Sequence, residues 1–471
     1  MEALFDGLTP ATGVLLVVSL LVAFGFEFVN GFHDTANAVA TVIYTRSLRP
    51  WTAVILSGVC NFLGVFIGGI AVAMSIMSLL PVELLVQSGI GGGLAMILAL
   101  LVSAIAWNLG TWYFGLPASS SHTMIGAILG VGVANSLLPG HEFGAGVNWA
   151  KAGDVGLALL LSPVIGFSIA ALLLLLSKRL IRDPQLYRPP VGTKPPPAGI
   201  RSLLIFTCTG VSFAHGSNDG QKGVGLVMLI LMGIVPVGFA INLEAAKPEL
   251  QRAEQAVVTI HEALAGAELK TDDAKKKIAE VEDELAELKV TLGTATKATD
   301  IAADKRFQVR KDILLIDSTL KKLDQQEALG LAKDQAKRVK EARKDLRGLT
   351  DYAPNWVLFC VALSLGVGTM VGWRRIVVTI GEKIGKDHLT YGQGAAAELV
   401  AMSTIGISAG LGLPVSTTHV LSSGVAGTMV AQGSGLQRGT VAKILSAWVL
   451  TLPVTMILSG VLFLVFRAML S

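Results

Sequence analysis

Long apolar runs dominate this chain, and they set the strongest limit on its fold. Several approach the about 20 residues that a helix needs to cross a bilayer, among them 12–29, 94–114, 155–176 and 442–470. Two further apolar runs, 203–213 and 224–241, are predicted to be separate spanning or near-spanning segments. The 471 residues are 52% hydrophobic and only 15% charged, which is typical of a polytopic membrane protein. Because lipid cannot satisfy backbone polar groups, such runs must form helices or closed barrels. Their length predicts an all-α, multi-pass membrane protein.

One stretch, residues 244–351, has a different composition. It holds 21 of the 38 Lys and Arg and 22 of the 34 Asp and Glu. Apolar residues recur there at alternating spacings of three and four, which is typical of a coiled-coil seam. The two series are Ile278, Val281, Leu285, Leu288 and Leu292, then Ile313, Ile316, Leu320 and Leu323. We expect a soluble antiparallel coiled-coil hairpin inserted at 244–353 and projecting into the cytoplasm.

Two pairs of matching motifs divide the apolar part into halves. GFHDTAN at 31–37 is echoed by GSNDGQK at 216–222, and GLPASSSHT at 115–123 by GLPVSTTHV at 412–420. Such internal symmetry is typical of secondary transporters built from inverted repeats, with the site at their interface. We expect a first transmembrane repeat at 1–177, a Pro-rich basic linker at 178–201, and a second repeat in two parts, 202–243 and 354–471.

Three apolar pieces beside these motifs are too short, or too rich in Gly and Ser, to be ordinary spans. They are 36–44, 121–138 and 418–430, and we predict that they form half-helices or re-entrant segments. Irregular backbone at membrane depth is tolerated only beside protein or a water-filled cavity. These pieces are therefore expected to line the site.

The four motifs, in this order, resemble the signatures of the inorganic phosphate transporter family, and the Asp-containing pair is close to that of its bacterial low-affinity members. The resemblance covers both apolar halves and leaves out 244–351. It implies a bacterial inner-membrane protein that carries phosphate by secondary active symport and alternating access, with both termini outside. It does not imply an enzyme. The positive-inside tendency places the basic linker 178–201 in the cytoplasm, and alternation from there places the second basic loop, 374–386, outside.

A phosphate carrier needs hydrogen-bond donors at its site, and helix N-termini supply them. Pro117 and Pro414 are placed to open two half-helices, with hydroxyls directly after each. The expected phosphate-binding residues are Ser119, Ser120, Ser121, Thr123, Ser416, Thr417, Thr418, Asn218 and Lys222. The alternative is that these Ser and Thr residues are small packing residues between helices.

Carboxylates repel phosphate, so we interpret Asp34 and Asp219 as cation or proton sites beside it. Asn37 lies one helical turn after Asp34 and shares its face. An alternative role for either Asp is helix capping. Intramembrane acids and a histidine complete the candidates for ion coupling, which are Asp34, Asn37, Asp219, His33, Glu27 and Glu398.

Two departures from the family signature bear on the coupling ion. Its commoner form has Asn where this chain has His33 and Lys222. A Na⁺ site wants oxygen ligands, so a lysine damages one of the two cation sites. We therefore predict coupling to H⁺, with Na⁺ at Asp34 and Asn37 as the alternative.

Other assignments stay open or are excluded. The substrate is free phosphate or a metal–phosphate complex, and the rivals are a carrier of another oxyanion such as sulfate, or a membrane-anchored coiled-coil scaffold. No cofactor or resident metal is expected, since Cys60, Cys208 and Cys360 are isolated in apolar runs. The net charge of +4 is too dispersed to indicate nucleic acid. Membrane lipid surrounds the chain, and a homo-oligomer is neither predicted nor excluded.

Overall fold

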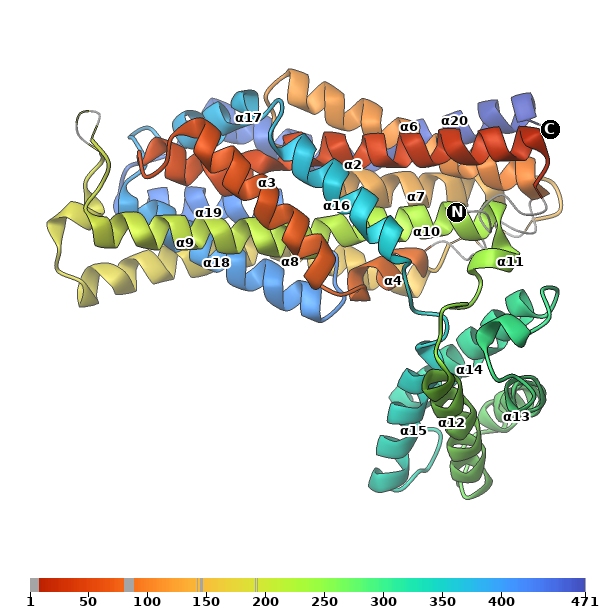
Figure 1. Cartoon of the computed structure of the whole chain (residues 1–471). Coiled ribbons are helices and arrows are strands. Elements are labelled where there is room, and N and C mark those ends of the chain that lie inside the picture. The colour runs from red at the N-terminus through yellow and green to blue at the C-terminus, as the bar shows by residue number, and fades with distance from the viewer. Residues whose placement is uncertain are drawn as a thin grey trace. The chain divides into compact units, whose positions relative to one another are not determined.

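The structure is a computed structural model that describes residues 8–79, 89–141, 143–144, 147–190, 192 and 194–470. The chain forms two compact units (Figure 1). We call Pro10–Ile234 with Pro354–Ser471 the membrane unit. The unit that contains Val235–Ala353 is called the insert unit.

The membrane unit consists of helices. In its first half these are α2 (Pro10–Tyr44), α3 (Pro50–Ile67), α4 (Ala71–Met77), α6 (Gly89–Tyr113), α7 (Ser120–Ser136), α8 (Trp149–Leu180) and the short 3₁₀ helix η1 (Pro184–Tyr187). In its second half they are α9 (Ala198–His215), η2 (Gly216–Gly220), α10 (Gln221–Ile234), α16 (Asn355–Thr369), α17 (Arg374–Val378), η4 (Thr379–Lys383), α18 (Tyr391–Gly410), α19 (Thr417–Gln432) and α20 (Arg438–Leu470).

Several of these helices can cross a membrane. Within the described residues, five are long and apolar enough, namely α2, α3, α6, α8 and α20. The segment α16 with α17 and η4 is a further candidate, bent by 55° at its break. The multi-pass, all-helical character expected from the apolar runs is therefore confirmed.

The second Asp motif lies within one uninterrupted helical segment. Helix α9, the π-helical turn η2 and α10 follow one another without a break from Ala198 to Ile234. Gly216 opens η2, and a Cβ there would lie 2.2 Å from the backbone oxygen of Asn61 on α3. The absence of a side chain thus lets two helices meet at the motif. The sequence had predicted two separate spans here, and that prediction is wrong.

This continuity changes the topology expected from simple alternation. One crossing fewer puts both basic loops at the same end of the membrane unit. Pro190 of the linker and Arg374 of the second loop line a single cavity, together with His388 just after that loop. The expectation that the second loop lies on the opposite side from the linker is therefore wrong.

The other end of the membrane unit holds the helix ends that lead to the chain termini and to the insert unit. Helix α2 and α16 run side by side in the same direction, since Phe28 meets Gly368 and Phe32 meets Gly372. Figure 1 shows the starts of α2 and α16 and the ends of α10 and α20 at the end away from α17 and the α8–α9 connection. Met1 to Gly7 and Ser471, on which the expected position of the termini also depends, lie outside the described residues.

The predicted half-helices have mixed outcomes. Helices α7 and α19 are short and each begins after an extended Leu-Pro segment, as expected. Their N-caps are Ser119 and Ser416, so the prolines precede the helices and do not open them. Residues 36–44 are not a half-helix, because α2 continues unbroken through the first Asp motif to Tyr44. The pattern of small residues there permits helix and does not interrupt it.

Corresponding helices of the two halves exchange partners. Helix α7 packs against α20 and α19 against α8, while α2 packs against α16 and α9 against α3. Each half is therefore completed by helices of the other. This interlocking brings the four motifs to a common centre.

The insert unit differs from the predicted hairpin. It contains α11 (Pro236–Phe239), α12 (Lys247–Ala265), α13 (Asp272–Gly293), η3 (Ala298–Asp300), α14 (Arg306–Gln325) and α15 (Lys333–Arg347). All nine predicted seam residues are buried on α13 and α14. They share one core with α12 and α15, so four helices surround the seam. The two-helix hairpin was wrong because the amphipathic flanking segments also bury an apolar face.

Candidate functional site

Asp34 lies on α2 at the N-termini of both half-helices. Its side chain is buried and accepts hydrogen bonds from Ser120 Oγ of α7 at 2.6 Å and Thr418 Oγ1 of α19 at 2.6 Å. Asn37, one turn further along α2, donates to Thr418 Oγ1 at 2.9 Å and to Asp34 Oδ1 at 3.4 Å. One carboxylate therefore gathers hydroxyls from both halves of the chain.

Asp219 occupies the matching place on the π-helical turn η2. It is fully buried and forms an ion pair with the ammonium of Lys222, itself 2% exposed. Thr417 Oγ1 of α19 donates to Asp219 Oδ2 at 3.2 Å. Lys222 also donates to Ser121 Oγ and to the backbone oxygen of Val415. Three polar partners thus satisfy the ammonium of this buried lysine.

The two halves make equivalent contacts. The motif alignment pairs Asn37 with Lys222 and Ser121 with Thr418. Asn37 donates to the hydroxyl of Thr418, and Lys222 donates to the hydroxyl of Ser121. Each contact joins an Asp motif of one half to the half-helix of the other. Lys222 therefore stands where the first half has an amide, as the sequence comparison indicated.

His215 joins the two carboxylates and was not among the predicted site residues. Its Nε2 lies 3.3 Å from Asp219 Oδ2 and 3.9 Å from Asp34 Oδ2. Its Nδ1 is 2.9 Å from Asn61 Oδ1 on α3. The spacing of four residues between His215 and Asp219 places them on one helix face, and this signal could have identified it. The sequence had predicted separate segments on either side of this motif, an arrangement that does not fix the two residues on one helix face.

A divalent cation also has ligands at this point. The ligand atoms of Asp34, His215 and Asp219 lie within 4.8 Å of one another, and all three residues are buried. Imidazole nitrogen with carboxylate oxygen suits a transition metal, and carboxylates alone suit Mg²⁺. The sequence had indicated no metal ligands, because Asp34 and Asp219 lie 185 positions apart in two separate motifs.

The remaining predicted substrate residues support the half-helices. Ser119 and Ser416 accept hydrogen bonds from the backbone N–H three residues later, on His122 and His419. Thr123 Oγ1 donates to the backbone oxygen of Ser119 at 3.0 Å. These three side chains are therefore committed to helix geometry in this conformation.

Asn218 supports the loop before the second half-helix. Its Nδ2 donates to the backbone oxygen of Leu413 at 3.0 Å, and its Oδ1 accepts from the backbone N–H of Val415 at 3.3 Å. The amide thus fixes the approach to α19. Neither of these contacts involves Asp34 or Asp219.

His33 and Glu27 lie on α2, the helix that carries Asp34. His33 Nδ1 is 3.4 Å from Asp34 Oδ1, and its Nε2 is 3.1 Å from Thr111 Oγ1 on α6. Glu27 is fully buried and packs on Gly223, where a Cβ would lie 2.3 Å from the carboxyl carbon. Glu27 therefore approaches the backbone next to Lys222, so an acid of the first half reaches the motif of the second.

Glu398 on α18 belongs to a separate polar cluster. It is fully buried and accepts hydrogen bonds from Thr41 of α2 and Thr207 of α9. Thr41 lies two helical turns after Asp34, on the same face. The structure therefore does not bring Glu398 to the carboxylates, but it connects this acid to the helix that carries Asp34.

Comparison with known proteins agrees with the motifs. A model of the phosphate transporter family matches residues 30–195 and 187–459. The low-affinity inorganic phosphate transporters PitB and PitA of Escherichia coli K12 are 43% and 44% identical to this chain. Each alignment covers 98% of this chain and 99% of the relative. A probable low-affinity inorganic phosphate transporter of Bacillus subtilis 168 is 28% identical, covering 95% and 97%.

A solved structure shares the fold. It is described as the sodium-dependent phosphate transporter and superposes with a TM-score of 0.56 over 97% of this chain and 99% of that one, at 20% identity. The family resemblance of the four motifs is thus confirmed by matches that extend over nearly the whole sequence. The chain belongs to the phosphate transporter family.

Proposed function

We propose that this chain transports inorganic phosphate across a bacterial inner membrane, coupled to protons, by alternating access. One observation carries the proposal. Two buried carboxylates, one from each half, lie where hydroxyls from the N-termini of α7 and α19 meet. Helix N-termini favour anions, and the relatives are named transporters of phosphate, not enzymes.

The hydroxyls supply a reason for coupling. A Ser or Thr hydroxyl carries one proton to donate, and Ser120 and Thr418 donate theirs to Asp34. They cannot donate to phosphate at the same time. When Asp34 takes up a proton, its charge is removed and both hydroxyls become available for the anion. Cation uptake and phosphate binding then favour each other, as symport requires.

The identity of the coupling ion rests on Lys222. In the second half its ammonium occupies the position beside Asp219 where a Na⁺ ion would have to bind. His215 and His33 lie beside the carboxylates, and histidine side chains serve as proton shuttles in many proteins. A second candidate, Na⁺ at Asp34, is favoured by Asn37 Oδ1, which is buried and accepts no hydrogen bond in the described residues. The group of possible metal ligands formed by Asp34, His215 and Asp219 also supports a metal–phosphate complex as substrate.

A gradient experiment distinguishes the two ions. In sealed proteoliposomes, an inward H⁺ gradient without Na⁺ should accelerate accumulation of labelled phosphate. A Na⁺ gradient at symmetric pH should leave uptake at the rate seen without a gradient. Empty liposomes under the same gradients provide the control. Acceleration by Na⁺ alone would instead assign coupling to the Asp34 and Asn37 oxygens.

The arrangement of the two halves supports alternating access. Helix α2 runs into the site from the end of the membrane unit opposite the linker, whereas α9 runs into it from the linker end (Figure 1). Corresponding elements thus run in opposite directions, as inverted repeats do. Tilting one set of helices against the other would open the site to each side in turn.

The hydroxyl clusters should act on phosphate binding more than on folding. Ser120→Ala and Thr417→Ala each remove one hydrogen bond to a charged group, a loss of about 1.5–3 kcal/mol. The apparent KM for phosphate should rise roughly ten- to a hundredfold. Ser136→Ala, at the far end of α7, is the matched control, because its hydroxyl only bonds the backbone of Val133. Loss of thermal stability at unchanged KM would favour the packing role.

We further infer that the linker end of the membrane unit faces the cytoplasm. The linker 178–201 and the loop with Arg374, Arg375, Lys383 and Lys386 share that end, and cytoplasmic loops are enriched in Lys and Arg. The end of α10 and the start of α16, which flank the insert, lie at the other end (Figure 1). The insert that they bracket would then be outside, together with both termini. This replaces the cytoplasmic position that two separate spans had predicted for the insert.

Cysteine labelling tests this orientation. Lys289→Cys in the insert unit and Lys194→Cys in the linker are both exposed positions, and they are introduced after Cys60, Cys208 and Cys360 are replaced by Ala. In intact spheroplasts a membrane-impermeant maleimide should label Lys289→Cys. It should label Lys194→Cys only after permeabilisation. The opposite pattern would show that the linker end faces outward.

A further inference from the structure

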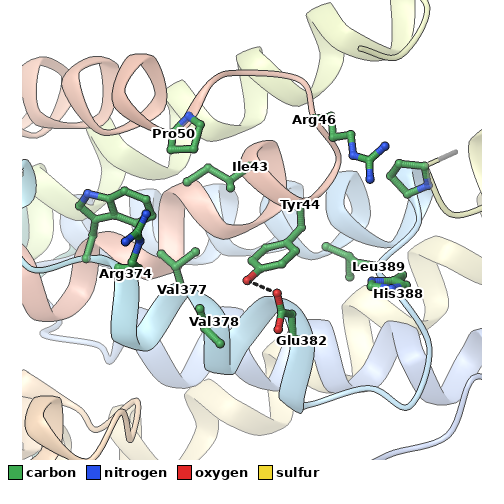
Figure 2. A pocket seen from close by; sticks show the side chains of 12 residues that line it. Ile43, Tyr44, Arg46, Pro50, Arg374, Val377, Val378, Glu382, His388 and Leu389 are labelled. Carbon is green, nitrogen blue, oxygen red and sulfur yellow. Dashed lines mark hydrogen bonds between the residues drawn. The ribbon is translucent and has the colours of Figure 1, made fainter. Parts of the chain in front are cut away.

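Two adjoining hollows open at the linker end of the membrane unit, away from the buried carboxylates. The first, of about 430 Å³, lies between the end of α2 and η4 (Figure 2). The second, of about 670 Å³, lies between α6 and α17. Trp373, Arg374 and Val378 line both. We call the second one the basic hollow.

The basic hollow is lined by cations. Arg374, Arg375 and Lys383 contribute to its wall, and no Asp or Glu is among the described residues that line it. Arg375 is held in place, because its guanidinium lies 4.9 Å from the ring centre of Trp112 and 5.0 Å from that of Tyr113. It donates one hydrogen bond to the Tyr113 backbone oxygen at 2.6 Å, which leaves further N–H donors. A preformed set of positively charged hydrogen-bond donors suits a phosphate oxyanion.

Exposed aromatic side chains surround these cations. Trp51, Tyr113 and Phe114 are 66%, 62% and 75% exposed and contribute to the same hollow. Trp and Tyr are enriched where a membrane protein meets the headgroup region. An aromatic rim beside basic groups therefore places the hollow at headgroup level, where acyl chains can lie against the rings.

The first hollow is less suited to an anion. Glu382 is part of its wall and accepts a hydrogen bond from the Tyr44 hydroxyl at 2.8 Å (Figure 2). Arg46 and Arg374 also line it and lie on opposite sides of this pair in the view. A carboxylate in the same wall offsets the attraction of these cations for an anion, so the basic hollow is the stronger candidate.

We propose that the basic hollow binds the phosphate headgroup of an acidic phospholipid from the leaflet at the linker end. Free phosphate shares the same chemistry, but it gains nothing from the aromatic rim. A basic pocket between membrane helices is a known form of headgroup recognition. Arg374 and Lys383 lie at the two ends of α17 and η4, so a headgroup held by both would restrain that segment. Gly381 of this segment packs on the Tyr44 ring of α2, the helix that carries Asp34.

Lipid titration of the purified full-length protein tests the site. Short-chain phosphatidylglycerol is added in detergent, and bound lipid is counted by native mass spectrometry, with phosphatidylcholine in parallel. Phosphatidylglycerol should bind more tightly than phosphatidylcholine. Each basic residue contributes about a fivefold change in affinity for an acidic lipid. Arg374→Gln with Lys383→Gln should therefore weaken phosphatidylglycerol binding roughly thirtyfold.

The matched control removes the same charge from the same end of the unit. Lys386→Gln with Arg438→Gln changes two exposed cations outside the hollow and should leave lipid binding unchanged. Equal weakening by both double variants, or no preference for phosphatidylglycerol, would overturn the proposal. Displacement of phosphatidylglycerol by millimolar inorganic phosphate would do the same, since it would assign the hollow to free phosphate. Unchanged melting temperatures without added lipid verify that both variants are folded.

Discussion

Asp34→Asn and Asp219→Asn are each expected to lower phosphate uptake by about a hundredfold or more in reconstituted vesicles. Asn keeps the shape of Asp but removes its charge. At Asp34 the change weakens two charge-assisted hydrogen bonds, from Ser120 and Thr418, each worth about 1.5–3 kcal/mol. At Asp219 it removes the ion pair with Lys222. The change at Asp34 also eliminates the group that we propose takes up the coupling proton.

The measurement needs a carboxylate that serves as a control. Asp154→Asn, near the start of α8, alters an exposed acid outside the site and should transport at the rate of the unmodified protein. Insertion and folding are checked for all three variants by size-exclusion chromatography in detergent. Rates near normal for both properly folded site variants would refute the assignment of these carboxylates.

Lys222→Met is expected to destabilise the protein, and adding Asp219→Asn is expected to restore much of the loss. Removing one partner of a buried ion pair leaves an uncompensated charge and costs about 3–5 kcal/mol. That corresponds to a fall in melting temperature of roughly 5–10 °C. In the double variant no buried charge is left unpaired at this position. Both variants should lack coupled transport, because the single variant leaves the second carboxylate without its partner and the double variant lacks that carboxylate.

Thermal scans at one fixed rate compare the four proteins of this cycle, since unfolding of membrane proteins is often irreversible. The coupling energy between the two positions is the quantity of interest. Additive losses in the double variant would show that Lys222 and Asp219 do not depend on each other. A Lys222→Met protein with unchanged stability would mean that His215, 3.3 Å from Asp219, already neutralises the carboxylate.

Much of the site could be predicted because it is duplicated. The two Asp motifs and the two hydroxyl clusters each occur twice in the same order, and polar residues at the ends of apolar runs are costly unless they meet partners. The structure places Asp34, Asp219, Ser120, Thr417 and Thr418 together, as that argument requires. The 3–4 spacing of apolar residues likewise identified the buried face of α13 and α14.

The contacts between motifs could not be predicted. Nothing local indicates that Asn37 reaches Thr418 while Lys222 reaches Ser121, because these pairs depend on how the halves interlock. Glu398 was predicted to serve the same site as Asp34, yet it bonds Thr41 and Thr207. Sequence position located each acid at membrane depth but could not say which helix faces it.

The sequence by itself determined that most of this chain lies in a membrane, that its polar motifs are duplicated, and which polar residues those motifs contain. Hydropathy, duplication and residue type can all be read without knowing how the helices pack. Tertiary structure alone decided whether the Asp motifs interrupt their helices. Gly216 lies against the Asn61 backbone, and this packing accommodates a π-helical turn in an otherwise continuous helix, where Gly and polar residues had indicated a break. Because this helix is continuous, both basic loops lie at one end of the membrane unit, and His215 lies beside the two carboxylates. Whether a helix continues through a glycine depends on the helices that pack against it, and the motif does not specify where those helices lie.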